Sequence, residues 1–354
     1  MKVLEIHNLL FQKYWSFFTE REKLGPFYNW HYIRFLEEAV GDSLLGNFSF
    51  IVTDEDDPVV VFPIIIERGD YGNQISVKNG PIPYWVWSQR ISRKKRKRAL
   101  EEVQDKLNQL TREYDIVLQK SLVDTLSFVN REDHYNILIE QGHLDFSITT
   151  RIVNLQESSE SLWLGIRKSY KSLINKGMKY FEIIMVDHKN SERDIYFEFE
   201  KLYVAAAGKE VYKKSAWEIL FNLIEEDKGL LVLIKKKGRF IGGAFFQHEN
   251  EKVYYSLGAN HPVYETDFYI GHVYIWSAIQ YYIARKFKYF EVGWQNLYPQ
   301  VLSQPSPKER SISMFKCGFG GIDMPLFRGV KFYNFDVCKK FVRFNVDNFF
   351  KTLK

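Results

Sequence analysis

Basic side chains cluster where a helical pattern opens the second half of the chain. Apolar residues recur at helical spacing between Ser159 and Lys176, which predicts one helix. Arg167 and Lys171 lie four residues apart and share a face of that helix, with Lys168 beside them. Like charges one turn apart repel, and anion binding is one reason to keep them, because Arg matches phosphate oxygens and Lys supplies a point charge. A solvated basic face is the alternative.

A single lysine precedes a glycine-rich segment further along the sequence. Phe315 and Lys316 are followed by Cys317-Gly318-Phe319-Gly320-Gly321. A cation fixed in a partly dry site stabilises a developing negative charge far better than the same cation in water. The two final glycines would let the backbone approach a substrate closely. The segment therefore suits catalysis or donor binding, and a plain turn between two strands is the alternative.

Acidic and phenolic side chains occur at predicted strand ends and loops, where proton-transfer groups often lie. Glu291 ends a strand, Glu265 and Asp267 precede an aromatic helix, and Tyr255 belongs to an aromatic strand. Each has a structural alternative: a surface or capping carboxylate for Glu291, a helix N-cap for Asp267, and core packing for Tyr255. The sequence does not choose among them.

A second basic feature opens a long predicted helix in the first half of the chain. It consists of six consecutive cations: Arg93, Lys94, Lys95, Arg96, Lys97 and Arg98. Positive charges near a helix N-terminus oppose the helix dipole, so this placement costs stability. Contact with RNA phosphates, contact with an anionic membrane and plain solvation are three open explanations.

Composition limits the classes of protein. The chain has 354 residues, 45% of them hydrophobic and 17% aromatic, which suggests about two well-packed domains and excludes a disordered tail or a collagen-like fibre. Two cysteines are too few for a disulfide framework or a thiolate zinc site, and the eight His residues are scattered, so no metal is expected. The net charge of +5 includes +6 from residues 93–98, which leaves −1 for the rest.

Motifs of other enzyme classes do not occur. The sequence has no Gly-x-Ser-x-Gly, Walker, Gly-x-Gly-x-x-Gly or His-Glu-x-x-His pattern.

An acid and a His interrupt the N-terminal region where a signal peptide needs an apolar core, and the longest apolar run, Val59 to Ile66, is far shorter than the ~20 residues that span a bilayer. We expect a cytoplasmic protein, with membrane association left open.

The elements that must position these side chains follow one order in both halves. The second half has helices at 192–207 and 215–226, followed by strands at 230–234, 239–247 and 252–257. A helix after Asp267 and a strand at 289–292 complete it. The first half has helices at 9–22 and 30–40, strands at 48–52, 59–66 and 74–78, a helix at 92–114, a strand at 116–119, a helix at about 122–141 and a strand near 146–153. We predict an N-terminal domain over 1–150, a C-terminal domain with the active site over 151–330, and a helix at 331–354 that packs back on the body.

This element order resembles the GNAT acyltransferase fold, and a tandem pair of such units resembles the FemABX-like transferases. Three segments carry the resemblance: the basic helix at 167–176, the aromatic helix and strand from Gly271 to Trp294, and Phe315-Lys316 with its Phe-Gly-Gly. It covers most of residues 150–330 and, more loosely, the first half. The implied fold class is α/β with mixed sheets (α+β), arranged as two tandem GNAT-like domains, each a mixed sheet flanked by helices.

The resemblance implies an N-acyltransferase or aminoacyltransferase that acts on an amine of a cell-envelope precursor, either a peptidoglycan precursor or a nucleotide- or lipid-linked amino-sugar intermediate of a polysaccharide. It implies that Lys316 stabilises the negative charge formed at the reacting carbonyl. Transfer to an amine also needs a general base, or a substrate group in its place, and Glu291 and Asp267 are the candidates. The substrate-binding residues would be Arg167, Lys168, Lys171, Phe315, Tyr255 and Trp276.

The acyl donor stays open between acyl-CoA and aminoacyl-tRNA. GNAT enzymes that use CoA carry an Arg/Gln-x-x-Gly-x-Gly/Ala loop whose amides hold the pyrophosphate. The equivalent segment here, Asn260 to Gly271, lacks that pattern, which disfavours CoA, whereas many Fem-type proteins use charged tRNA. The alternative class is a non-catalytic, degenerate tandem GNAT protein that binds a polyanionic partner, RNA or an anionic membrane, through its two basic clusters.

Overall fold

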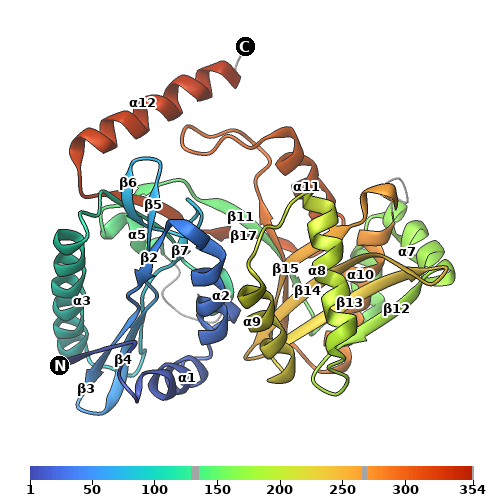
Figure 1. Ribbon diagram of the computed structural model, residues 1–354, viewed down its shortest axis with the longest axis horizontal. Coiled ribbons are helices and arrows are strands. Elements are labelled where there is room, and N and C mark those ends of the chain that lie inside the picture. Colours follow the sequence, from blue (N-terminus) through green and yellow to red (C-terminus); the bar gives the residue numbers. More distant parts are fainter. Residues whose placement is uncertain (129–134, 265–268, 353–354) are drawn as a thin grey trace. The chain divides into compact units, whose positions relative to one another are not determined.

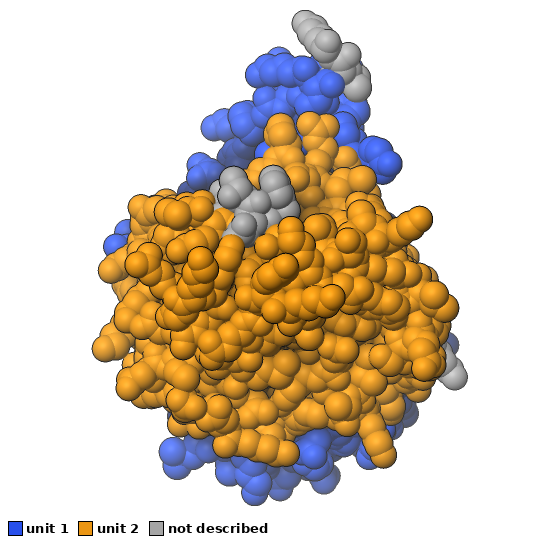
Figure 2. Space-filling view, turned by 90° about the vertical axis from the view of Figure 1, so that its right-hand side faces the viewer, with its two compact units in different colours: residues 1–148, 298–306, 325–354 blue, residues 149–297, 307–324 orange. Residues whose placement is uncertain are grey.

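The chain divides into two compact units. The computed structural model describes residues 1–128, 135–264 and 269–352. Unit 1 is formed by 1–148, 298–306 and 325–354 and unit 2 by 149–297 and 307–324; Figure 2 colours them blue and orange. Residues 298–306 and 325–330, which the sequence analysis assigned to the C-terminal domain, therefore belong to unit 1. Glu265 and Asp267 lie outside the described residues.

Unit 1 combines two sheets with helices (Figure 1). Its helices are α1 (Phe11–Arg21), α2 (Trp30–Val40), α3 (Arg93–Glu113), α4 (Thr125–Phe128), α5 (Ile137–Glu140) and α12 (Phe335–Thr352). One sheet has the order β1 (Lys2–Glu5), β3 (Phe50–Asp54), β4 (Asp57–Phe62), β8 (Val86–Trp87). The other has the order β10 (Leu144–Asp145), β18 (Arg328–Phe332), β9 (Leu118–Leu122), β6 (Gly72–Ile75), β5 (Ile65–Gly69), β2 (Leu44–Asn47), with β7 (Ile82–Pro83) paired to β9.

The apolar run from Val59 to Ile66, predicted as one strand, is two strands in different sheets. β4 ends at Phe62 and β5 begins at Ile65. Pro63 lies between them, and proline has no N–H to donate to a strand partner, so the ladder stops there and the chain passes to the second sheet.

The helix predicted over about 122–141 was also wrong. Leu122 is the last residue of β9, which pairs with β18 from Arg328 to Phe332, and the described residues beyond it form only the short helices α4 and α5. The buried carboxylate of Asp124 accepts a hydrogen bond from the Leu126 N–H and fixes the turn after the strand. The strand partner comes from the far end of the sequence, which no local pattern reveals.

Unit 2 is one sheet between layers of helices (Figure 1). The sheet has the order β12 (Glu182–Val186), β13 (Gly229–Lys236), β14 (Arg239–Glu249), β15 (Lys252–Asn260), β16 (Tyr289–Gln295), β11 (Ile148–Asn154), β17 (Ile322–Leu326). The helices are α6 (Ser159–Gly165), α7 (Lys168–Tyr180), α8 (Arg193–Ala207), α9 (Lys214–Glu225), α10 (Ile270–Ala284) and α11 (Pro307–Cys317). The run α8, α9, β13, β14, β15, α10, β16 has the predicted order.

β13 shows why this order could be predicted from local patterns. Leu230 and Val232 belong to the core cluster that contains α10, while Leu233 faces the opposite side, where it and Phe199 of α8 both lie against Gly243. A strand buried on both faces is apolar without alternation, as the run 230–234 is. The sheet is therefore covered by α10 on one face and α8 on the other.

α12 packs on unit 1 through a narrow contact. Phe341 is its one buried side chain and clusters with Leu118, Phe146 and Val330. The rest of the helix is partly or fully exposed. Over the part of the chain that the structure describes, no helix is both long enough and apolar enough to cross a bilayer.

Candidate active site

Two neighbouring strands of unit 2 part from each other beside a cluster of polar side chains. β15 and β16 pair in parallel only from Lys252 opposite Tyr289 to Tyr254 opposite Glu291. Beyond these residues β15 continues along β14, and β16 continues along β11. Polar side chains at such a divergence are held by rigid strands without a neighbouring strand to cover them.

Lys316 is held at this divergence by the last turn of α11. The Ser313 hydroxyl accepts a hydrogen bond from the Asn296 N–H at 2.9 Å, and the Cys317 thiol donates to the Gln295 side chain at 3.0 Å. These contacts tie α11 to the end of β16 on both sides of Lys316. The Lys316 ammonium lies 5.9 Å from the centre of the Tyr255 ring.

Gly293 makes room for the lysine. Its φ is +113°, and a Cβ placed there would lie 2.7 Å from the Lys316 Nζ. The register of β16 against β11 also shifts at this point, with Ile152 opposite Glu291 and Arg151 opposite Gly293. Such a bulge re-aims the neighbouring side chains. Both features show that β16 is shaped around the ammonium.

The surroundings change the acidity of Lys316. Its side chain is largely enclosed, and burial lowers its pKa from the ordinary lysine value to about 8 because it disfavours the charged form. Attraction to the nearby Glu291 carboxylate opposes this shift. Lys316 is consequently a cation at neutral pH that loses its proton at a lower pH than an exposed lysine does.

Glu291 lies at the end of the paired part of β16. It is fully buried, and its Oε1 accepts a hydrogen bond from the Thr150 hydroxyl of β11 at 2.6 Å. A buried carboxylate needs partners of this kind to remain stable in the interior. The Glu291 carboxylate is close enough to act electrostatically on the Lys316 ammonium.

Tyr255 supplies a hydroxyl that keeps its proton. Its Oη lies 3.2 Å from the Oη of Tyr274 on the first turns of α10. Burial raises the pKa of Tyr255 well above the ordinary phenol value, and Tyr274 raises it further. A phenol of this kind donates hydrogen bonds rather than removing protons, so the structure favours Glu291 over Tyr255 as the base among the described candidates.

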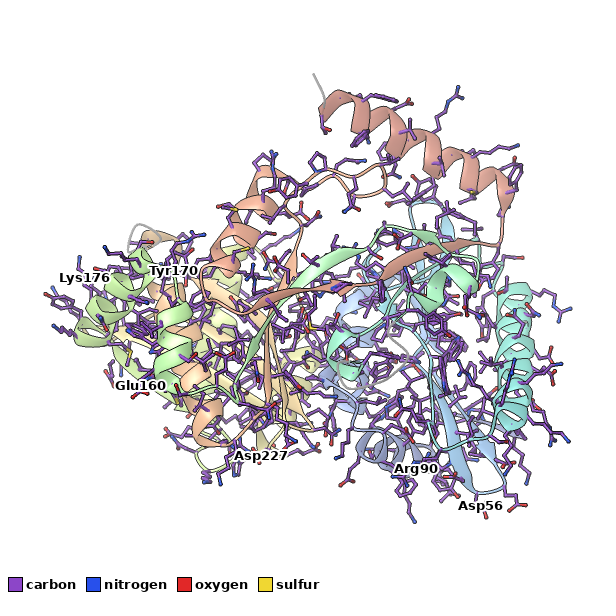
Figure 3. The ribbon with its side chains drawn as sticks, turned by 180° about the vertical axis from the view of Figure 1, so that it is seen from behind. Asp56, Arg90, Glu160, Tyr170, Lys176 and Asp227 are labelled. Carbon is purple, nitrogen blue, oxygen red and sulfur yellow. The ribbon has the colours of Figure 1, made fainter. Side chains whose placement is uncertain are left out.

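Aromatic rings join α7, α10 and α11 behind Lys316. Tyr170 of α7, labelled in Figure 3, donates a hydrogen bond through its hydroxyl to the Phe315 carbonyl at 3.2 Å. His272 of α10 stands perpendicular to the rings of both Tyr170 and Phe315, with centroids 4.2 and 5.0 Å apart. Phe315 is thus packed into an aromatic group that fixes the position of its neighbour Lys316.

The helix predicted from Ser159 to Lys176 is interrupted at Ile166 and Arg167, between α6 and α7. The glycine-rich segment occupies the break: the Arg167 N–H donates to the Gly318 carbonyl at 2.9 Å. A Cβ on Gly318 would lie 2.0 Å from the Tyr170 ring, and one on Gly321 would lie 2.3 Å from a backbone carbonyl of β11. Gly318 and Gly321 therefore allow close packing within the protein, and the approach of the backbone to a substrate at Gly320 and Gly321 stays a prediction.

The basic residues of α7 have separate surroundings. Arg167 and Lys168 are exposed at the start of the helix, and the Arg167 guanidinium lies 5.1 Å from the Tyr170 ring centre. The Lys171 ammonium donates to the Leu164 carbonyl at 3.0 Å and so holds the end of α6. The contact of Arg167 with Gly318 brings the basic segment next to the segment that carries Lys316.

Other predicted residues lie elsewhere. Trp276 is buried in the core of unit 2, where it packs against Trp163 at 5.0 Å between ring centres. In unit 1, the basic run opens α3: Lys95 pairs with Asp54, and the Arg96 guanidinium lies 3.7 Å from the Trp87 ring centre. Arg93, Lys94, Lys97 and Arg98 are exposed.

Sequence reasoning missed Thr150, Tyr274 and Tyr170 as parts of the site. Thr150 holds Glu291 from a strand far away in the sequence, and Tyr170 was assigned only to an apolar stripe. Gly293 did carry a signal, because glycine inside a strand pattern often marks a bulge or a close approach. Among the described residues, His, Cys, Asp and Glu side chains do not form groups of three that could hold a metal ion.

The comparisons with known proteins concern structure. No family model matches the sequence, and no curated protein is significantly similar to it. The structure of FemX matches with a TM-score of 0.63 and 12% identity, over 97% of this chain and 100% of that one. L-PGS from Bacillus licheniformis matches with a TM-score of 0.57 and 9% identity, over 94% and 95%. A C-terminal domain from Agrobacterium fabrum, provisionally described as lysylphosphatidylglycerol synthetase, gives 0.57 and 9%, over 93% and 94%.

At these identities the likeness establishes the fold. The chain has the FemX fold along nearly its whole length, and the predicted fold class, a mixed α/β protein with tandem GNAT-like units, is confirmed. The FemABX-like resemblance seen in the short sequence motifs is confirmed for the fold.

Proposed function

We propose that the protein is an N-acyltransferase or aminoacyltransferase that acts on an amine of a cell-envelope precursor. The observation that carries this proposal is Lys316, an enclosed ammonium with a pKa of about 8, fixed at the divergence of β15 and β16 beside Glu291 and Tyr255. Groups of this kind suit a reaction in which negative charge develops on a carbonyl oxygen.

The reaction balances with the residues present. The amine nitrogen attacks the carbonyl carbon of the donor, a C–N bond forms, and the carbonyl oxygen becomes an oxyanion. Lys316 stabilises this oxyanion as a cation, and the protonated Tyr255 hydroxyl donates a hydrogen bond near it. Collapse of the intermediate breaks the bond to the leaving group, an ester oxygen in an aminoacyl-tRNA or a sulfur in an acyl-CoA, and the leaving group takes up the proton that the amine has given to the base.

The proton of the attacking amine has to be removed, and Glu291 is the described group we assign to this step. Its Oε1 is held by Thr150, which fixes the carboxylate's orientation. Asp267, the carboxylate that precedes the aromatic helix in the sequence, remains a candidate from sequence alone. Arg167 and Lys168 are exposed next to the glycine-rich segment and would bind phosphates of the acceptor.

The name of the Agrobacterium neighbour describes synthesis of a lysylated phospholipid, and the missing CoA loop disfavours CoA. Both points favour an aminoacyl donor. The acceptor in this proposal is a peptidoglycan precursor or a nucleotide- or lipid-linked amino sugar, encountered in the cytoplasm or at a membrane.

The direct test is a transfer assay with labelled donors. The protein is incubated with acyl-CoAs or charged tRNAs together with cell-envelope precursors, and label is followed into the precursor. We expect transfer by the wild type and by Lys308→Met, which removes an exposed lysine from the first turn of α11. For Lys316→Met we expect transfer that is slower by about a hundred- to a thousandfold. Transfer that survives Lys316→Met at the wild-type rate contradicts the proposal.

A further inference from the structure

The Lys316 amine is held without an ion pair within the part of the chain that the structure describes. Lys288 shows the usual arrangement, since its ammonium lies 2.6 Å from a Glu251 oxygen and this contact raises its pKa. Glu291 attracts the Lys316 amine across space, and its own Oε1 is bonded by the Thr150 hydroxyl. A lysine that lacks a bonded carboxylate gives up its proton more readily than a paired one.

The amine stands where two strands leave room. β15 and β16 pair only as far as Tyr254 and Glu291, and a Cβ at Gly293 would lie 2.7 Å from the Lys316 Nζ. The Lys316 side chain is partly exposed, so solvent and small solutes have access to it. Rigid backbone thus holds an accessible amine in one place.

These surroundings change the chemistry of the amine. Only an uncharged lysine has a lone pair that attacks carbon, and a lysine with the ordinary pKa of about 10.4 is uncharged in under ~1% of molecules at pH 8. Burial lowers the pKa of Lys316 to about 8, so roughly half of its amines are uncharged at that pH. Lysines desolvated in this way serve as nucleophiles in enzymes.

We propose that Lys316 is a self-acylation site, where its uncharged Nζ takes the acyl group of an ester or thioester donor in place of the acceptor amine. Nζ attacks the carbonyl carbon, a C–N bond forms, and the C–O or C–S bond to the leaving group breaks. Glu291 accepts the proton that Nζ gives up, and this proton ends on the departing alcohol or thiol. The product is a neutral amide at residue 316.

The consequence for regulation rests on the proposed function. An acylated Lys316 carries no positive charge, so it no longer stabilises an oxyanion and transfer stops. A donor that meets the site without an acceptor amine would therefore silence the enzyme. The attacking lysine and the lysine that assists transfer are the uncharged and charged states of one group, so a rise in pH favours self-acylation.

Lys331 of unit 1 provides a matched comparison. Burial lowers its pKa as well, and within the described residues no carboxylate acts on its amine. Its strand, β18, is paired on both sides, by β10 and β9. Lys331 therefore shows what burial does to a lysine that lacks a strand divergence and a nearby proton acceptor.

Acetylation by p-nitrophenyl acetate, a small activated ester, tests the inference without any assumption about the natural donor. The whole protein is treated at pH 8, hydroxylamine removes acetyl groups from thiols and phenols, and peptide mass spectrometry gives the rate at each lysine. We expect Lys316 to react about tenfold faster than the exposed Lys308, and faster than Lys331. The larger uncharged fraction outweighs the weaker nucleophilicity of a less basic amine.

The pH dependence separates the amine from its neighbours. Burial raises the pKa values of Tyr255 on β15 and Tyr274 on α10, so both keep their protons, and Glu291 on β16 is the facing carboxylate among the described residues. The acetylation rate of Lys316 should therefore rise through about pH 8 and then level off, whereas the rate of an ordinary lysine goes on rising.

Two variants test the geometry and the route of attack. Gly293→Ala displaces Nζ and should lower the rate at Lys316 toward that at Lys331, whereas Gly238→Ala should not. Cys317→Ser should leave the rate unchanged, because Nζ attacks the ester directly. The inference is overturned if Lys316 reacts no faster than Lys331, if Gly293→Ala has no effect, or if Cys317→Ser abolishes the label.

Failure of this inference and failure of the proposed function give different results. Slow acetylation of Lys316, together with slowed transfer by Lys316→Met, overturns self-acylation and supports the function. Fast acetylation of Lys316 that leaves transfer unimpaired supports self-acylation and contradicts the role of Lys316 in transfer.

Discussion

Lys316 and Lys95 are the same residue type in opposite surroundings. Burial lowers the pKa of Lys316 to about 8, while the hydrogen bond with Asp54 raises the pKa of the exposed Lys95. Lys95 belongs to a run of six consecutive cations at 93–98, whereas Lys316 has no other charged residue within two positions of it in the sequence. The comparison shows that enclosure by strands and a neighbouring carboxylate, rather than density of charge, marks the group suited to chemistry.

Removing the enclosed cation should have the largest effect. Lys316→Met is expected to lower kcat by about a hundred- to a thousandfold, the usual cost of losing one group that stabilises an oxyanion. Steady-state kinetics of transfer check this value. Lys95→Met, measured in parallel, should change kcat less than twofold; equal losses in the two variants would remove the distinction between them.

Gly293→Ala tests whether β16 is shaped around the ammonium. The positive φ should cost about 1–3 kcal/mol in unfolding free energy, and the new Cβ would displace Nζ and lower kcat. Gly238→Ala is the matched control, because Gly238 has a φ of +78° with no atom within 4 Å of the added Cβ. A loss of stability in both variants, with loss of turnover only in Gly293→Ala, is the expected result of denaturation and kinetic measurements.

Thr150→Val removes the hydroxyl that holds Glu291. Leaving a buried carboxylate without this hydrogen bond should lower the unfolding free energy by about 1–3 kcal/mol, measured by urea unfolding, and should reduce kcat more than it changes KM. The neighbouring Thr149→Val serves as control, since Thr149 is only partly buried. If kcat is unaltered in Thr150→Val, the hydrogen bond from Thr150 is not needed to orient Glu291 for catalysis.

Substitution of Lys95, the exposed lysine, should have the smallest effect. Lys95→Gln removes its ion pair with Asp54, and exposed pairs of this kind contribute little because water screens them. We expect no measurable change in the urea midpoint or in transfer. A clear loss of stability would show that the run at 93–98 is a structural feature of unit 1.

Local sequence patterns predicted the helices and strands that depend on residues near one another in the sequence. The order from α8 to β16 follows from apolar periodicity, and α2 was predicted with the bounds it has. Contacts between distant segments could not be predicted: β18 turns Leu122 into the end of a strand, and Gly318 separates α6 from α7. Lys316 could be chosen from the resemblance, but its enclosure depends on Gly293, Tyr255 and Glu291, which meet only in the fold.

The pH dependence of kcat/KM tests the role of Lys316 most directly. If Lys316 acts as a cation, kcat/KM for transfer should fall as pH rises through about 8, because the ammonium loses its proton there. Lys316→Arg, which stays charged, should move this descending limb to higher pH even if its rate is lower. A rate that instead rises through pH 8 with lysine and loses this rise with arginine would contradict the account, since Lys316 would then act as a base.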